Sequence, residues 1–318
     1  MKQKITVVGL GGVGGYFGFK LAQHFKTNLE ISISFIGRGA TYETVKNNGL
    51  TLISPENTVD AVYPDRLVQH IAELPDTTIY LICVKEYDLE NICQQLKPSV
   101  SADTIIIPLM NGVDIYERIR KIITVGKVLP SCVYVASHIK EKGTVEHKGN
   151  SGRIITGKDP EHPEFDPQSI IALLKAADID ITLKDDAFPD IWAKFFFIAS
   201  FGLVSARYNQ PIGQINENPE LHLRAEKIMN EILAIAHASK IDIPAQIIEQ
   251  TFQRASSFPY HTPTSLQLDV QSGKAHTELA LFSGAILRLG QQYAIDVKET
   301  ATIEREILNL PVTESELL

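Results

Sequence analysis

The chain has 318 residues, of which 44% are hydrophobic and 21% are charged, and its formal net charge is −8. Because single domains cluster near about 100–150 residues, a chain of this length is expected to form two domains. The acidic balance excludes an extended nucleic-acid surface, which needs a basic patch or stripe. Three cysteines without close spacing exclude a disulfide framework and a conventional zinc site, so we expect no bound metal.

The same features predict a cytoplasmic protein. Free cysteines, such as Cys83 in the apolar run 79–84, indicate a reducing compartment. Residues 1–4 lead directly into a strand and a glycine loop, without the apolar stretch and cleavage site of a signal peptide. The longest apolar run, 195–204, is too short to span a membrane, so no membrane association is expected.

The first predicted elements are a buried strand over 4–8, a helix over 16–25 and a second strand over 30–36. The segment between the first strand and the helix reads Gly9-Leu10-Gly11-Gly12-Val13-Gly14-Gly15. Gly9, Gly11 and Gly14 form the G-x-G-x-x-G pattern, which lets the backbone approach the pyrophosphate of a dinucleotide at a helix N-terminus. The alternative is a glycine-rich turn that binds no ligand.

The end of the second strand indicates which dinucleotide binds. Units that bind NAD place an acidic residue here to hold the ribose 2′-hydroxyl, whereas an arginine suits the 2′-phosphate of NADPH. This strand is followed by Gly37-Arg38-Gly39, and Glu30 lies at its opposite end. Arg38 therefore predicts NADPH, with an ordinary surface charge as the alternative.

Strands and helices continue to alternate through residue 183. We expect helices over 40–48, 89–96, 115–122 and 170–176, and strands over 51–53, 61–63, 78–84, 103–108, 128–136 and 179–183. Residues 143–157 predict an antiparallel hairpin at the sheet edge. The alternation is typical of an α/β domain with a parallel sheet and crossover helices.

Strand patterns end near residue 186. Helices are expected from Pro189-Asp190 to Tyr208 and over 219–239, 245–256, 276–293 and 298–308. The sequence thus predicts a Rossmann-type NADP-binding domain over 1–185, followed by an all-helical substrate and catalytic domain over 186–318.

Three polar residues stand out at predicted element boundaries or in apolar surroundings. Lys85 and Asn111 each follow a strand, at the carboxyl ends where open α/β sheets bind ligands. A surface lysine and a simple Asn-Gly turn are the alternatives. Lys194 has apolar residues on every side of its helix, and a buried ammonium is suited to proton transfer. Its alternative is a lysine that reaches water at the domain edge.

In this order, the motifs resemble the ketopantoate reductases (2-dehydropantoate 2-reductases) over nearly the whole chain. The matching pieces are the glycine loop, Arg38-Gly39, Val84-Lys85, Asn111-Gly112, the segment 145–157, Trp192-Ala193-Lys194, Ser265 with Asp269, and Thr277-Glu278. The resemblance implies an active site in a cleft between a Rossmann domain and a helical domain. It also implies that Lys194 is the general acid, that Glu278 supports the lysine and the substrate, and that Asn111 and Ser265 contact the substrate.

The implied activity is NADPH-dependent reduction of a 2-keto acid, with 2-dehydropantoate converted to pantoate in pantothenate biosynthesis. NADPH would lie along residues 9–14 with Arg38, Lys85 and Asn111, and the partner would be a small-molecule 2-keto acid. A homodimer is one of the oligomeric states that the resemblance allows.

The sequence departs from the family on the substrate side. Ile198, Gly202 and Ile212 stand where the family usually has asparagines. Either other polar groups replace them, namely Ser200, Ser205, Asn209 or Thr262, or the substrate is a different and more apolar 2-keto acid. A third alternative is a redox-sensing module that holds NADPH without turnover.

Overall fold

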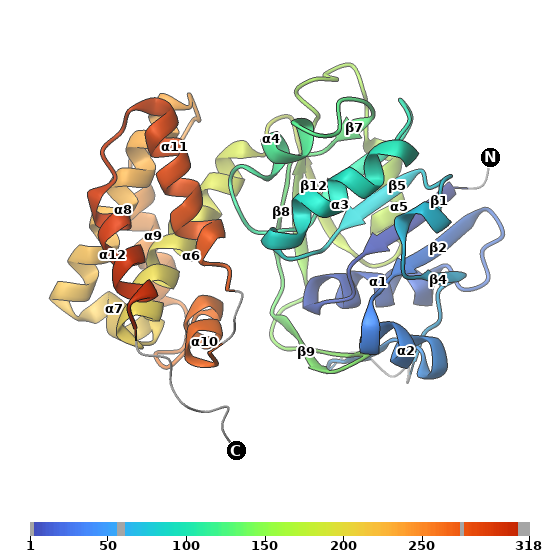
Figure 1. Cartoon of the computed structure of the whole chain (residues 1–318), viewed down its shortest axis with the longest axis horizontal. Helices are drawn as coiled ribbons and strands as arrows, with labels where there is room; N and C mark the ends of the chain where they lie inside the picture. Colours follow the sequence, from blue (N-terminus) through green and yellow to red (C-terminus); the bar gives the residue numbers. More distant parts are fainter. Residues whose placement is uncertain (1–2, 56–60, 274–276, 311–318) are drawn as a thin grey trace. The chain divides into compact units, whose positions relative to one another are not determined.

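A parallel sheet of six strands forms the centre of residues 1–187 in the computed structural model, which describes residues 3–55, 61–273 and 277–310 (Figure 1). Its strands are β1 (Gln3–Val8), β2 (Ile31–Ile36), β4 (Arg66–Val68), β5 (Ile79–Ile82), β6 (Ile105–Pro108) and β7 (Lys127–Val128). Their order in space is β4-β2-β1-β5-β6-β7. This is the doubly wound order of dinucleotide-binding domains, so the predicted α/β class is confirmed.

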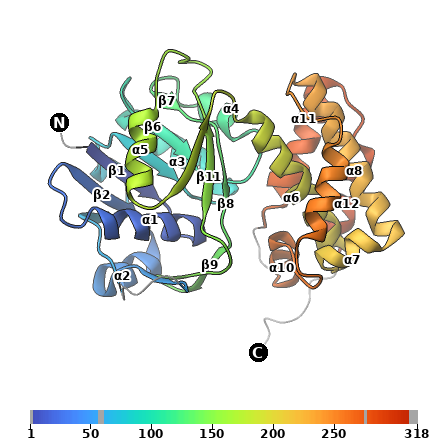
Figure 2. The same cartoon turned by 180° about the vertical axis from the view of Figure 1, so that it is seen from behind.

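Helices cover both faces of this sheet, which explains its continuous apolar strands. α1 (Gly12–His24) and α5 (Gln168–Ala176) lie in front of it in Figure 2, and α3 (Leu89–Leu96) lies in front in Figure 1. α3 buries Leu89, Ile92, Cys93 and Leu96, the i, i+3, i+4, i+7 stripe of an amphipathic helix. The unit also contains the helices α2 (Gly39–Asn48) and α4 (Ile115–Arg120).

The predicted hairpin over residues 143–157 is wrong. Its two halves are β10 (Thr144–His147) and β11 (Arg153–Gly157), which belong to different three-stranded sheets. β10 pairs with β9 (Ser137–Glu141) and β3 (Thr51–Ile53), and β11 pairs with β8 (Ser131–Tyr134) and β12 (Asp180–Lys184). The tight turn lies instead between β9 and β10, where Gly143 has a φ of 77°. Residues 148–152 carry the chain from one sheet to the other.

Two shorter predictions also need correction. The strand expected over 128–136 is two strands in different sheets, β7 and β8, separated by Leu129 and Pro130. Pro130 has no N–H to continue a ladder. Of the strand expected over 61–63, only a bridge between Leu50 and Val62 forms, and the edge strand is β4.

Residues 188–318 form the second unit, and its described part is helical, as predicted. The helices are α6 (Phe188–Tyr208), α7 (Ile212–Glu217), α8 (Pro219–Ala238), α9 (Ile247–Ser256), α10 (Ser265–Gln271), α11 (Ala285–Tyr293) and α12 (Lys298–Leu308), with a π-helical turn, η4 (Ala280–Gly284), before α11. The helix predicted over 276–293 starts at His276, which lies outside the described residues. α7 and α10 were not predicted.

α6 is the central helix of this unit and packs against α7, α8, α9, α10 and α12. Pro189 and Asp190 lie in its first turn. A backbone N–H has no acceptor within the helix at this position, so a proline is tolerated, and the carboxylate of Asp190 lies near the positive end of the helix dipole. Phe195, Phe196 and Phe201 are fully buried. The helix is long and apolar enough to cross a membrane, but most of it is buried inside the unit, as in the core helix of a globular domain.

Candidate functional site

The carboxyl ends of three neighbouring strands meet at one edge of the six-stranded sheet. β1 lies between β2 and β5 in parallel register, with Val8 opposite Ile36 on one side and Ile82 on the other. The chain leaves β1 at Gly9, leaves β2 at Gly37 and leaves β5 at Cys83. Because the strand order reverses at β1, this edge is the crevice in which open α/β sheets bind ligands.

The glycines at the end of β1 meet the steric needs of a dinucleotide loop. Gly9 has a φ of 92°, which side chains other than glycine rarely adopt. A Cβ on Gly14 would collide with the carbonyl oxygen of Gly9, so this glycine lets α1 approach the strand. A Cβ on Gly11 would meet no protein atom within 4 Å. The space beside Gly11 therefore suits a pyrophosphate on the N-terminus of α1.

A cavity of about 570 Å³ opens at this edge. Of the predicted cofactor residues, Gly9, Leu10, Gly11, Arg38 and Lys85 line it. Gly12, Val13, Gly14 and Asn111 are not among its described lining residues. The residues present fit a dinucleotide: a glycine loop at a helix N-terminus, an arginine after β2 and a lysine after β5.

The β9–β10 turn contributes to the same cavity. Ile139 and Lys142 line it, and the carbonyl oxygen of Ser137 lies so close to Gly12 that a Cβ there would collide with it. Gln69 and His70, which follow β4, also line the cavity. No local sequence pattern connects these residues with the glycine loop, because they come from segments distant along the chain.

Arg38 forms an ion pair with a residue that the sequence did not single out. Its Nη2 atom donates to Oδ2 of Asp88 at 2.7 Å. Asp88 ends the 3-10 turn Glu86–Asp88 after β5 and also lines the cavity. The Arg38 side chain is 59% exposed and that of Asp88 is 24% exposed. The cavity thus has both a guanidinium and a carboxylate beside the end of β2.

The structure buries the two predicted catalytic residues in the second unit. Lys194 on α6 is 8% exposed, and Glu278, two residues before η4, is 7% exposed. The ring centroids of Phe195 and Phe282 are 6.4 Å apart, so α6 packs directly on the segment that follows Glu278. Ser265 is the first residue of α10, and its neighbour Thr264 is the N-cap, accepting a hydrogen bond from the N–H of Gln267 at 3.1 Å.

The α6 face that contains Lys194 continues through Ile198 and Gly202, at helical spacings of four and eight residues. A Cβ on Gly202 would lie 3.8 Å from the ring of Phe282 and 3.9 Å from the Cβ of Leu266. These are ordinary van der Waals contacts, so the Cβ of an alanine would fit at this position. The surroundings of this position are apolar.

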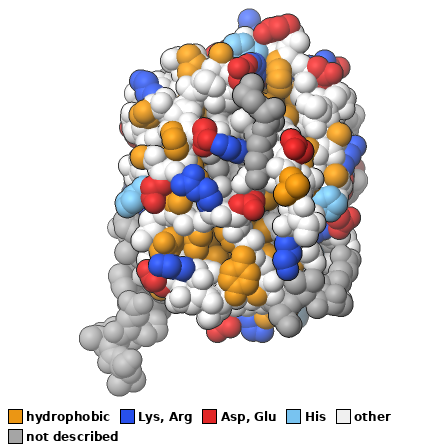
Figure 3. Space-filling model, turned by 90° about the vertical axis from the view of Figure 1, so that its right-hand side faces the viewer, with side chains coloured by type: hydrophobic (Ala, Val, Ile, Leu, Met, Phe, Trp, Pro, Cys, Tyr) orange, Lys and Arg blue, Asp and Glu red, His pale blue; other side chains and the backbone are white. Residues whose placement is uncertain are grey.

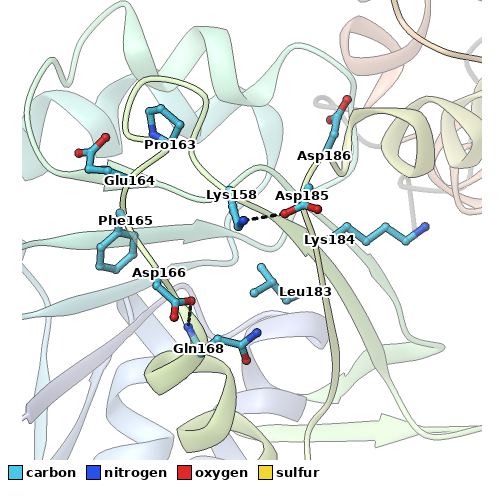
Figure 4. A pocket seen from close by; sticks show the side chains of 10 residues that line it. All are labelled: Lys158, Pro163, Glu164, Phe165, Asp166, Gln168, Leu183, Lys184, Asp185 and Asp186. Atoms are coloured by element: carbon cyan, nitrogen blue, oxygen red, sulfur yellow. Dashed lines mark hydrogen bonds and ion pairs between the residues drawn. The ribbon is translucent and has the colours of Figure 1, made fainter.

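A second cavity in the first unit, of about 710 Å³, has a different character (Figure 4). Its lining includes Lys158, whose Nζ atom lies 2.6 Å from Oδ1 of Asp185, and the Asp185 side chain is 92% exposed. Exposed ion pairs of this kind are common on protein surfaces. Figure 3 likewise shows basic and acidic side chains interspersed over one face of the molecule. We assign no site to this cavity.

The described residues contain no group of three or more His, Cys, Asp or Glu side chains placed to hold a metal ion. Burial raises the pKa of the Cys83 thiol, and it raises that of Cys93 to about 12. Thiols with such pKa values stay protonated near neutral pH and are poor nucleophiles.

Comparisons with known proteins agree with this geometry. The family model described as ketopantoate reductase PanE/ApbA matches residues 5–161, and its C-terminal counterpart matches residues 186–308. The uncharacterized oxidoreductase YkpB of Bacillus subtilis is 24% identical over 98% of this chain and 99% of its own length.

Two solved structures share the fold. A PanE/ApbA family ketopantoate reductase from Ralstonia eutropha superposes with a TM-score of 0.85 at 22% identity, over 96% of this chain and 97% of the other. A D-mandelate dehydrogenase, solved with NADH and anilino(oxo)acetate, has a TM-score of 0.84 at 19% identity, over the same shares of the two chains.

Proposed function

Because the chain belongs to the ketopantoate reductase family, we propose that it reduces a 2-keto acid to a 2-hydroxy acid with NADPH, and that 2-dehydropantoate is its substrate. It is an oxidoreductase of this type, acting on a small-molecule keto acid with a nicotinamide dinucleotide. The observation that carries the finer proposal is the glycine-loop cavity with Arg38 beside it. We further propose that the protein is cytoplasmic and serves pantothenate biosynthesis.

The first unit would hold the cofactor. The backbone of residues 9–14 offers the N-terminus of α1 to the pyrophosphate, and Arg38 would bind the 2′-phosphate as a charge-assisted, paired donor. Lys85 and Asn111 follow the neighbouring strands β5 and β6 and would complete the site at the same sheet edge. When bound, the reduced nicotinamide supplies a hydride to the carbonyl carbon of the substrate.

The second unit would supply the proton. We propose that Lys194 donates a proton from Nζ to the carbonyl oxygen and stabilises the negative charge that develops there. Glu278 would orient the ammonium, and Ser265, with Asn111, would hold the substrate. Burial of both Lys194 and Glu278 supports this proposal, because charged side chains are rarely buried without a partner.

A steady-state assay of NADPH oxidation, with 2-dehydropantoate and a panel of other 2-keto acids, tests the proposal. We expect multiple turnovers with 2-dehydropantoate and a kcat/KM within the ordinary enzyme range of about 10⁴–10⁸ M⁻¹s⁻¹. Turnover of another acid without turnover of 2-dehydropantoate would contradict the substrate. Nucleotide binding without oxidation by any carbonyl compound would favour a redox-sensing module instead.

A reductase for a more apolar 2-keto acid is the second candidate, and one observation favours it. Gly202 and Ile198 continue the α6 face of Lys194, and the neighbours of Gly202 are the apolar side chains of Leu266 and Phe282. A site without hydrogen-bonding groups cannot select strongly for a hydroxyl on the substrate. We propose that an apolar side chain of the keto acid would then contact this apolar part of the α6 face.

Replacing Gly202 with asparagine should shift the substrate selectivity of such an enzyme toward 2-dehydropantoate. We expect Gly202→Asn to raise the kcat/KM ratio of 2-dehydropantoate to an aromatic 2-keto acid by about tenfold or more, because a polar partner is introduced and apolar space is lost. Gly202→Ala is the matched control, since its Cβ makes only ordinary contacts and adds no polar group. An unchanged ratio in a folded Gly202→Asn protein would count against the second candidate.

A further inference from the structure

The ion pair between Arg38 and Asp88 spans the end of β1. Arg38 follows β2 and Asp88 follows β5, and these two strands flank β1 in the sheet. The 2.7 Å contact between Nη2 and Oδ2 therefore lies across the start of the glycine loop, and both residues line the 570 Å³ cavity. Asp88 is the N-cap residue of α3, but its side chain accepts no capping hydrogen bond from the backbone N–H groups of that helix.

The two groups of this pair favour different cofactors. A guanidinium binds the 2′-phosphate of NADPH, whereas a carboxylate accepts hydrogen bonds from the 2′-hydroxyl of NADH. Here a 2′-phosphate has to compete with Asp88 for Arg38, and it also meets the negative charge of Asp88. The unphosphorylated ribose meets an acceptor, and Arg38 keeps its ion pair.

We infer that Asp88 is a specificity-determining residue which weakens the preference for NADPH, so that the cavity accepts both NADPH and NADH. This inference rests on the proposed nucleotide site, but not on the identity of the keto acid. Lys142 and His70 also line the cavity and retain positive charge or hydrogen-bond donors for a phosphate when Arg38 is held by Asp88. The cavity therefore offers cationic or donor groups to a 2′-phosphate and a carboxylate acceptor to a 2′-hydroxyl.

Nucleotide fragments test the inference without any turnover. Adenosine 2′,5′-bisphosphate and adenosine 5′-monophosphate differ by the 2′-phosphate alone, and calorimetry gives the Kd of each for the full chain. We expect the wild type to prefer the bisphosphate by less than about tenfold. Asp88→Asn should increase that preference by about threefold to tenfold, as expected when a partly exposed charge is removed from a phosphate site. Arg38→Gln should reverse it.

Two comparisons make the result specific. In the Arg38→Gln background, Asp88→Asn should change the preference less than it does in the wild type, because the competition for the guanidinium is gone. Asp185→Asn removes the same charge from the exposed ion pair with Lys158, outside this cavity, and should leave the preference unchanged. The NADPH-to-NADH ratio of Kd values should follow the fragment ratio.

The inference would be overturned if Asp88→Asn left the preference unchanged, or if the wild type bound only the bisphosphate. Failure to bind either fragment would overturn both this inference and the cofactor assignment. Normal fragment binding without keto-acid reduction would instead overturn the proposed function and leave the role of Asp88 intact. The Tm of each variant shows whether its fold is retained.

Discussion

Lys194→Met is expected to lower kcat for keto-acid reduction by about 10²–10⁴-fold, the usual contribution of a general acid. Lys194 is 8% exposed on the central helix of the second unit. Methionine keeps the length and the packing of the side chain but cannot donate a proton or stabilise an alkoxide. The measurement is single-turnover and steady-state reduction of the best keto acid at saturating cofactor.

Stability and nucleotide binding separate a chemical defect from a folding defect. Because Lys194→Met would leave the buried Glu278 without its proposed partner, Tm is expected to fall, and kcat is compared at a temperature well below the Tm of both proteins. The Kd for adenosine 2′,5′-bisphosphate should change less than about twofold, because its cavity is lined by residues of the first unit. Lys227→Ala, at a side chain 53% exposed on α8, is the control and should keep full activity. A Lys194→Met enzyme with wild-type kcat would contradict the proposed proton donor.

The parts of the site that the sequence predicts are those encoded within one short segment. The glycine loop and Arg38 lie within a single βαβ unit, so the backbone conformation of Gly9 and the strand end before Arg38 follow from local pattern. The position of Lys194 follows in the same way from the apolar run around it. The structure puts this lysine on a buried helix, and its chemical role remains a proposal.

Features that depend on contacts between distant segments were not predictable. Alternating residues in 144–147 and 153–157 indicate strands, but not which partners they choose, and the two strands pair in different sheets. Gly152, in the segment that crosses between them, donates its N–H to the hydroxyl of Tyr16 on α1, 136 residues earlier. Asp88 is likewise an ordinary acidic residue in sequence, and only the parallel order β2-β1-β5 brings it to Arg38.

A second large effect is expected at a buried ion pair that holds the first unit together. Asp159 is fully buried and forms an ion pair with Arg120 of α4, whose side chain is 6% exposed. The carboxylate also accepts hydrogen bonds from the hydroxyl of Tyr116 at 2.8 Å and from the N–H of Val128 in β7 at 2.9 Å. One side chain thus connects α4, the edge strand β7 and the segment after β11.

We expect Asp159→Ala to lower the free energy of unfolding by about 3–5 kcal/mol, because it leaves a buried guanidinium and two buried donors without this acceptor. Urea denaturation, followed by circular dichroism, measures the change. Asp185→Ala, which breaks an exposed ion pair, is the control and should leave the urea midpoint nearly unchanged.

The double variant Arg120→Ala/Asp159→Ala shows whether the charge pair is the cause. If the loss comes from a buried charge that keeps only its ion pair with the exposed Glu161, removing both partners should cost less than the sum of the two single changes. Arg120 also donates to the carbonyl oxygen of Gly126 at 3.2 Å, so some loss should remain in the double variant. Additive single changes would instead show that each residue stabilises the unit through its own separate contacts.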